Sequence, residues 1–151
     1  MNFDLESSRK ILKIVGIVTI IGAVFTLIGG LLMVVGGGAV GVASPEVQTD
    51  TDLQTGVGAL IAGGAIVIIS GIVSLISGIV SVKASKENRY GKPAWIFAII
   101  GIVLAVINGV SSISSGVTFT GILSVLLNIA LNVMIYFAAN TIKTAYESGQ
   151  A

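Results

Sequence analysis

The chain has 151 residues, of which 54% are hydrophobic and only 10% are charged, with a net charge of +1 and a mean hydropathy of +1.04. A soluble domain carries roughly 25% charged residues, so this chain has too few charges to cover a surface in water, and its small net charge gives no reason to expect a nucleic-acid partner. It contains no cysteine and no histidine, which excludes disulfides, thiolate or imidazole metal sites and histidine general bases.

Four long apolar stretches predict four transmembrane helices, over residues 13–35, 57–82, 93–112 and 121–142. After Lys13, which begins the first stretch, none of them contains a charged side chain. Each is long enough to cross a hydrocarbon core of roughly 30 Å at about 1.5 Å per residue. The sequence therefore predicts an all-α fold, a four-helix transmembrane bundle that forms a single integral membrane domain over residues 1–151.

The basic residues predict how these helices are oriented in the membrane. All eight Lys and Arg residues lie at residues 9–13, in the turn 83–92 and at Lys143, whereas the expected outer loop 38–56 carries acidic residues and no basic one. Because basic residues are retained on the cytoplasmic side, we expect the turn 83–92 and both termini to face the cytoplasm.

The same turn is a candidate contact for lipid headgroups. Its basic residues follow one another at intervals of three: Lys83, Lys86, Arg89 and Lys92. Each can gain about 1 kcal/mol beside anionic headgroups, which makes the lipid bilayer an expected partner. The alternative is that they act only as determinants of topology.

Small residues recur at seven-residue spacing along the first two predicted helices. Two such series occur in the first helix: Gly22, Gly29 and Gly36, and beside them Gly16, Ala23, Gly30 and Gly37. The second helix has Gly64, Gly71 and Gly78, flanked by Ser74 and Ser81. In the third, small residues alternate at three- and four-residue steps: Ala98, Gly101, Ala105, Asn108, Ser112 and Ser115. Such series let helix backbones approach closely in lipid, so they predict packing seams; the alternative is the general richness of membrane helices in Gly and Ala.

A polar residue occupies every fourth position of the fourth predicted helix: Thr120, Ser124, Asn128, Asn132, Tyr136 and Asn140. An unpaired amide is costly in lipid, so Asn128 and Asn132 are expected to face other helices or water, with Asn108 a candidate partner. The line can act as interhelical glue, at roughly 0.6 kcal/mol per bond, or it can line a path for ions or a small solute. Asparagine is neutral and cannot shuttle protons, which favours glue.

Catalytic motifs are not found in the predicted helices. None carries a carboxylate, and no serine has a base to activate it, so we expect no enzyme, no cofactor and no metal. Two function classes remain. The first is a structural or accessory subunit that forms a homo-oligomer or joins a larger membrane complex through its small-residue seams. The second is a minimal channel or transporter with a polar path along the third and fourth helices.

The Ile- and Gly-rich first helix and the ending Tyr136-Phe137-Ala138-Ala139-Asn140 resemble the small, glycine-rich, four-span membrane proteins of unknown function that are common in Gram-positive bacteria. The resemblance covers the spacing and composition of the whole chain and implies no activity. The lack of cysteine and of an Asn-x-Ser/Thr sequon agrees with a bacterial plasma membrane.

Overall fold

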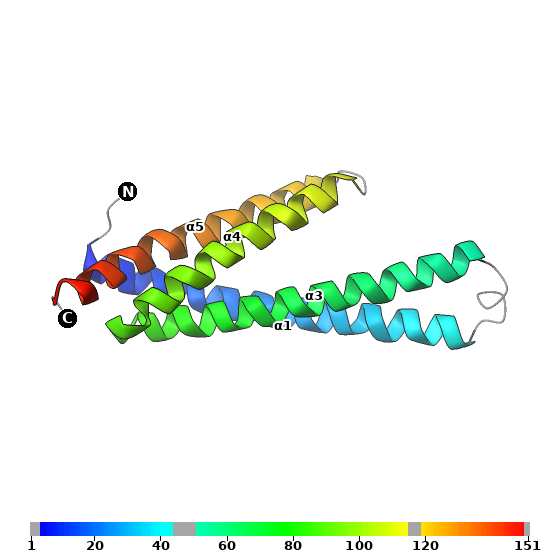
Figure 1. Ribbon diagram of the computed structural model, residues 1–151, viewed down its shortest axis with the longest axis horizontal. Helices are drawn as coiled ribbons and strands as arrows, with labels where there is room; N and C mark the ends of the chain where they lie inside the picture. Colours follow the sequence, from blue (N-terminus) through cyan, green and yellow to red (C-terminus); the bar gives the residue numbers. More distant parts are fainter. Residues whose placement is uncertain (1–3, 44–50, 115–118, 150–151) are drawn as a thin grey trace. The chain divides into compact units, whose positions relative to one another are not determined.

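The computed structural model describes residues 4–43, 51–114 and 119–149, and over these residues the chain is helical (Figure 1). The elements are α1 (Leu5–Ala43), α3 (Thr51–Ala84), the short 3-10 helix η1 (Asn88–Tyr90), α4 (Gly91–Ser114) and α5 (Phe119–Glu147). All four α-helices are long and apolar enough to cross a membrane. The predicted all-α class and the four apolar helices are therefore confirmed, and the architecture is that of a multi-pass membrane protein.

Each helix extends beyond the predicted span at both ends. Helix α1 begins at Leu5, well before residue 13, and at the expected outer loop 38–56 it continues to Ala43 while α3 begins at Thr51; residues 44–50 lie outside the described part of the chain. The apolar run of α1 continues through Ala43. Asp52 lies in the first turn of α3, where the positive end of the helix dipole stabilises a carboxylate.

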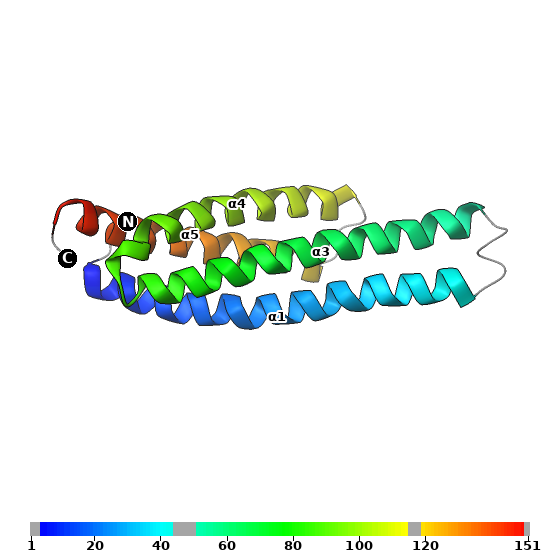
Figure 2. The same cartoon turned by 60° about the horizontal axis from the view of Figure 1, so that its bottom comes forward.

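The chain forms two compact units, which we describe separately. Unit 2, Gly22–Ile72, is a hairpin in which the second half of α1 and the first half of α3 run side by side. Unit 1 comprises Met1–Ile21 and Val73–Ala151, and within it α4 lies alongside α5 in both views (Figures 1 and 2).

The core of unit 1 is built mainly from small side chains. Its buried members come from all four helices: Leu12, Val15, Ala84, Ala94, Ala98, Ile135, Ala138, Ala139 and Ile142. Alanine at the contact positions brings the helix axes close together. Apart from these core members, many large apolar side chains point outward; Leu127, for example, is 61% exposed. This distribution suits a surface that meets lipid rather than water.

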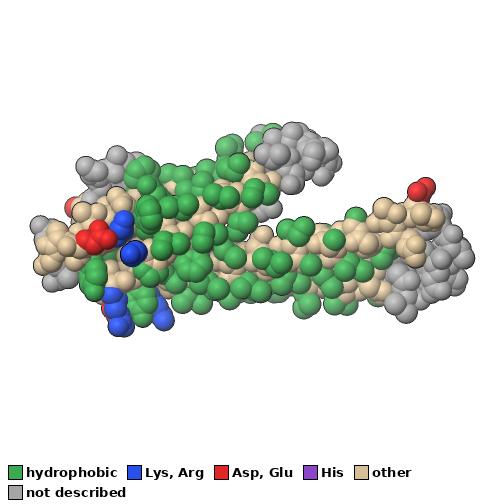
Figure 3. All heavy atoms as spheres, viewed as in Figure 1, with side chains coloured by type: hydrophobic (Ala, Val, Ile, Leu, Met, Phe, Trp, Pro, Cys, Tyr) green, Lys and Arg blue, Asp and Glu red, His purple; other side chains and the backbone are tan. Residues whose placement is uncertain are grey.

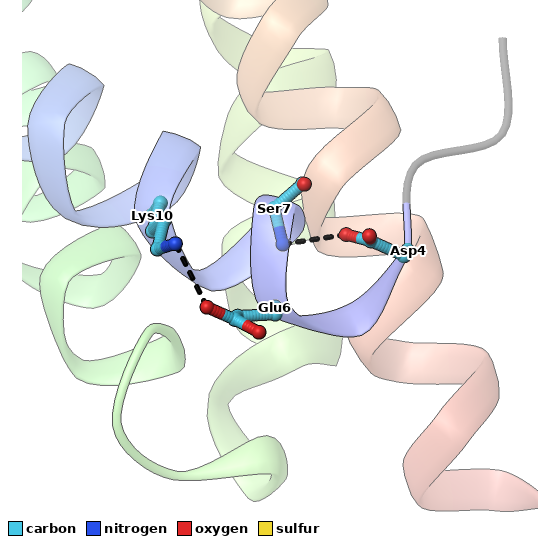
Figure 4. Close-up of polar contacts among 4 residues, drawn as sticks. All are labelled: Asp4, Glu6, Ser7 and Lys10. Carbon is cyan, nitrogen blue, oxygen red and sulfur yellow. Dashed lines mark hydrogen bonds and ion pairs between the residues drawn. The ribbon is translucent and has the colours of Figure 1, made fainter.

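The start of α1 is held by a local cap (Figure 4). The backbone N–H of Ser7 donates to Asp4 Oδ1 at 2.6 Å, and Lys10 forms an ion pair with Glu6 at 2.8 Å. Hydrogen bonds from the side chain and backbone of Ser7 lower the pKa of Asp4 below its ordinary value of 3.8, because they stabilise the ionised carboxylate. The cap fixes α1 from its first turn.

Candidate functional site

In unit 1, helices α1 and α3 contact each other through a pair of glycines. A Cβ added at Gly16 would lie 3.0 Å from the Gly78 carbonyl oxygen, and a Cβ added at Gly78 would lie 2.9 Å from the Gly16 carbonyl oxygen. These distances are shorter than an ordinary Cβ contact of 3.4–4 Å. The two backbones therefore touch directly, in the arrangement that favours Cα–H···O contacts between helices.

The same arrangement recurs in unit 2, two heptads further along α1. A Cβ at Gly30 would lie 3.0 Å from the Gly64 carbonyl oxygen, and a Cβ at Gly64 would lie 2.9 Å from that of Gly30. Between the two glycine pairs, Gly71 packs on the Leu27 side chain, where an added Cβ would meet Cγ and Cδ2 at 2.9 Å. The heptad spacing of both helices thus matches an antiparallel seam.

The two small-residue series of α1 differ in what they contact. Ala23, in the series that faces α3, is only 2% exposed. The neighbouring series was also predicted to pack, yet a Cβ added at Gly22, Gly29 or Gly36 would meet no described atom within 4 Å. One residue along a helix is about 100° around its axis. When one series faces α3, the other therefore points away from it.

The two serines predicted beside the α3 seam differ in burial. Ser81 is fully buried, its hydroxyl donates to the Ser77 carbonyl oxygen at 2.8 Å, and its Cβ lies 3.1 Å from the Cβ position of Gly16. Ser74 is half-buried. Ser81 is thus part of the contact between α1 and α3, with its hydroxyl satisfied within its own helix.

Between α4 and α5, Gly101 makes room for the side chain of Asn132. A Cβ at position 101 would overlap the amide oxygen of Asn132 and would lie 2.8 Å from its Cγ. Ala98 and Ala105, one turn away on either side of Gly101, are 0% and 4% exposed. The structure thus brings together a residue predicted as a packing position and one predicted as part of the polar line.

We expect the Asn132 amide to hydrogen-bond across helices, but the bonds seen in the described part of the chain lie within its own helix. Its Nδ2 donates to the backbone oxygen of Asn128 at 2.9 Å and to Asn128 Oδ1 at 2.7 Å. The Asn128 side chain is exposed. The side chains of Asn108 and Ser124 lie outside the described ones. Tyr136 is half-buried and contacts the Trp95 ring, with the centroids 5.8 Å apart.

The predicted basic turn forms a cluster of cations and aromatic rings. Lys83 Nζ lies 5.4 Å from the centroid of the Tyr90 ring, and Arg89 Cζ lies 4.9 Å from the same centroid. Lys86 and Lys92 are exposed, and within the described part of the chain neither has an ion pair or ring contact. In Figure 3 the visible Lys and Arg side chains (blue) gather near the left of the view, at one end of the helices of unit 1. Hydrophobic side chains (green) cover the helices to the right of these basic residues.

Two basic residues outside the turn also belong to this end of unit 1, although they lie far from the turn in the sequence. Arg9 of α1 donates from Nη2 to Asn88 Oδ1 at 2.9 Å, and Lys143 Nζ of α5 lies 4.4 Å from the centroid of the Trp95 ring. A sequence signal existed for Lys143, which follows Tyr136 by seven residues and so shares its helix face. No signal in the sequence pairs Arg9 with Asn88.

The described residues hold no group of three or more acidic, His or Cys side chains that could bind a metal ion. Comparisons with protein-family models, with curated proteins and with solved structures find no match for this chain. The resemblance to small four-span bacterial proteins therefore stays a prediction.

Proposed function

We propose that the protein is a non-enzymatic, multi-pass protein of the bacterial plasma membrane, a structural or accessory subunit that assembles through small-residue helix seams. In this proposal both termini and the η1 turn face the cytoplasm. Support for that orientation comes from unit 1, which contains all eight basic residues, because such residues are retained on the cytoplasmic side.

The observation that carries the proposal is the glycine series Gly22, Gly29 and Gly36 of α1. The series with Gly16 and Gly30 packs against α3, whereas a Cβ added at Gly22, Gly29 or Gly36 would meet no described atom within 4 Å. A face without side chains lets another helix approach closely and gain dispersion energy. Heptad spacing keeps this face on one side over three turns or more, long enough for a stable helix–helix contact.

The polar line of α5 supports packing rather than transport. Asn132 uses its amide nitrogen within α5 and fits its oxygen against Gly101 of α4, so this amide is occupied by its own neighbours. The exposed side chain of Asn128 is the one observation that favours a minimal channel or transporter. Flux of ions or small solutes from liposomes containing the protein, abolished by Asn128→Leu, would establish that second candidate.

The test of assembly is the variant Gly29→Leu, which adds bulk to the series Gly22, Gly29 and Gly36 at a position where an added Cβ meets no described atom within 4 Å. The matched control is Ile28→Leu, a volume-conserving change at a neighbouring position that is 51% exposed. Host membranes are treated with an amine-reactive cross-linker and the size of the cross-linked species is measured. We expect Gly29→Leu to shift the protein toward its monomer mass while helicity is retained, and Ile28→Leu to leave the size unchanged. Equal sizes for both variants would contradict the proposal.

A further inference from the structure

We infer that the η1 end of unit 1 holds a binding surface for the phosphate group of an anionic phospholipid, formed by three cations held on aromatic rings. Lys83 and Arg89 share the ring of Tyr90, and Lys143 lies over the ring of Trp95. The sequence alone predicts a lipid contact made by all four basic residues of the turn. The surface inferred from the structure leaves out Lys86 and Lys92 and includes Lys143 of α5.

Unbalanced positive charge is the first argument. Unit 1 contains all eight basic residues but only four of the seven acidic ones: Asp4, Glu6, Glu87 and Glu147. Glu6 pairs with Lys10, and Glu87 pairs with Arg89 at 2.6 Å. Within the described residues Lys83 and Lys143 have no carboxylate partner. Arg89 keeps its own carboxylate, so the unbalanced charge beside the Tyr90 ring is that of Lys83, and a bound anion would balance it.

Ring contacts also fix where the cations lie. A Lys or Arg side chain normally loses considerable rotamer freedom when it binds a ligand. Here the distances of 4.4–5.4 Å to the ring centroids are those of cation–π contacts, which hold the charges in place before the ligand arrives. Preorganised charges discriminate between ligands better than free ones.

Buried donors at the same end lack an acceptor. The indole N–H of Trp95 and the Nε of Arg9 are buried atoms without a hydrogen-bond partner in the described structure. Buried donors are nearly always paired, and phosphate oxygens are acceptors that match both an indole and a guanidinium. Arg9 is tied to Asn88 of η1 through its Nη2, and the Trp95 ring carries Lys143, so both groups belong to residues that contact the η1 end or the cation cluster.

The position of the cluster favours a lipid over a free phosphate ion. Lys83 directly follows the apolar segment 57–82, and Lys143 directly follows the apolar segment 121–142. Both cations therefore lie where a hydrophobic span ends, beside Trp95 and Tyr90, which are the residue types found at the membrane–water interface. This is the depth of the phosphate groups of phospholipids.

The test uses the fluorescence of Trp95, the chain's one tryptophan. The purified full-length protein in neutral detergent is titrated with phosphatidylglycerol. We expect a saturable change whose half-saturation concentration rises about fivefold in Lys83→Gln and in Lys143→Gln. Lys143→Arg, which keeps the cation, is expected to retain wild-type binding. The matched control is Lys10→Gln, which removes a charge from the same end but takes it from the ion pair with Glu6.

Three results would overturn the assignment. If phosphatidylcholine gives the same change in Trp95 fluorescence, binding does not require an anionic lipid. If inorganic phosphate gives the same change at equal concentration, the ligand is the free ion and not the lipid. A shift in Lys10→Gln as large as that in Lys83→Gln would mean that only the overall surface charge matters. None of these measurements depends on assembly through α1, so the inference can fail while the proposed function stands.

Discussion

Replacing Gly30 by alanine should loosen the hairpin of unit 2, whereas the same change at its neighbour Gly29 should not. The added Cβ at Gly30 would lie 2.9 Å from Ile68 Cγ1, 3.0 Å from the Gly64 carbonyl oxygen and 3.0 Å from the Ile68 backbone nitrogen. Two of these atoms are backbone and cannot rotate away. The helices must therefore separate by a few tenths of an ångström, which weakens the seam along its length.

The size of the effect follows from two opposing contributions. Alanine is favoured over glycine inside a helix by about 1 kcal/mol, and this gain applies equally to both positions. Overpacking a tight contact costs about 1–3 kcal/mol, and this cost applies only to Gly30. Because the helix-propensity gain cancels between neighbours, the difference in the free energy of unfolding between Gly30→Ala and Gly29→Ala should be about 1–3 kcal/mol.

The measurement is the loss of helical circular dichroism as dodecyl sulfate is added to the protein in a neutral detergent. Helix α3 offers an equivalent pair. A Cβ at Gly64 would meet Val34 at 2.7 Å, whereas one at Gly63 would meet only the flexible end of Met33 at 3.7 Å. Gly64→Ala should therefore behave like Gly30→Ala, and Gly63→Ala should be tolerated. If the two members of each pair unfold at the same detergent composition, the reciprocal glycine contact is not what holds the hairpin.

Three further predictions concern α5, α1 and topology. Gly101→Ala should destabilise unit 1 by up to about 2 kcal/mol, which is the overpacking cost of about 1–3 kcal/mol less the helix-propensity gain of about 1 kcal/mol. Asn132→Ala should restore most of the loss in the double variant; additive effects in the same unfolding assay would disprove their contact. The lowered pKa of Asp4 means that its cap stabilises α1 above about pH 3.8 and is lost as the pH falls through the folded value. The protection factors of the first-turn amides in hydrogen exchange, which correct for the intrinsic pH dependence of exchange, should therefore fall there, and Asp4→Ala should abolish this change in protection. A cysteine at Gln48 should react with a membrane-impermeant reagent in intact cells while one at Ser85 does not, and the reverse labelling would invert the topology.

The candidate site was predictable in part. Gly64, Gly71 and Gly78 were recognised because each falls on one heptad phase of a single helix, and that phase is a property of the sequence. The partner of Asn132 is not predictable from the sequence, because Gly101 is 31 residues away and nothing in its spacing indicates which α5 side chain it faces. Lys143 is isolated from the other basic residues along the sequence, and only the packing of α4 against α5 places it over the Trp95 ring.

Hydropathy and charge placement determined the helical class, the four apolar helices and the segregation of basic residues, since each of these depends on composition within a short stretch of chain. The tertiary structure decided which of two adjacent glycine series on α1 meets α3. Both series have the same spacing and the same residue types. They differ by about 100° around the helix axis, and that rotation is set by the shape of the opposing helix, where Gly64 and Gly78 receive the backbone of α1.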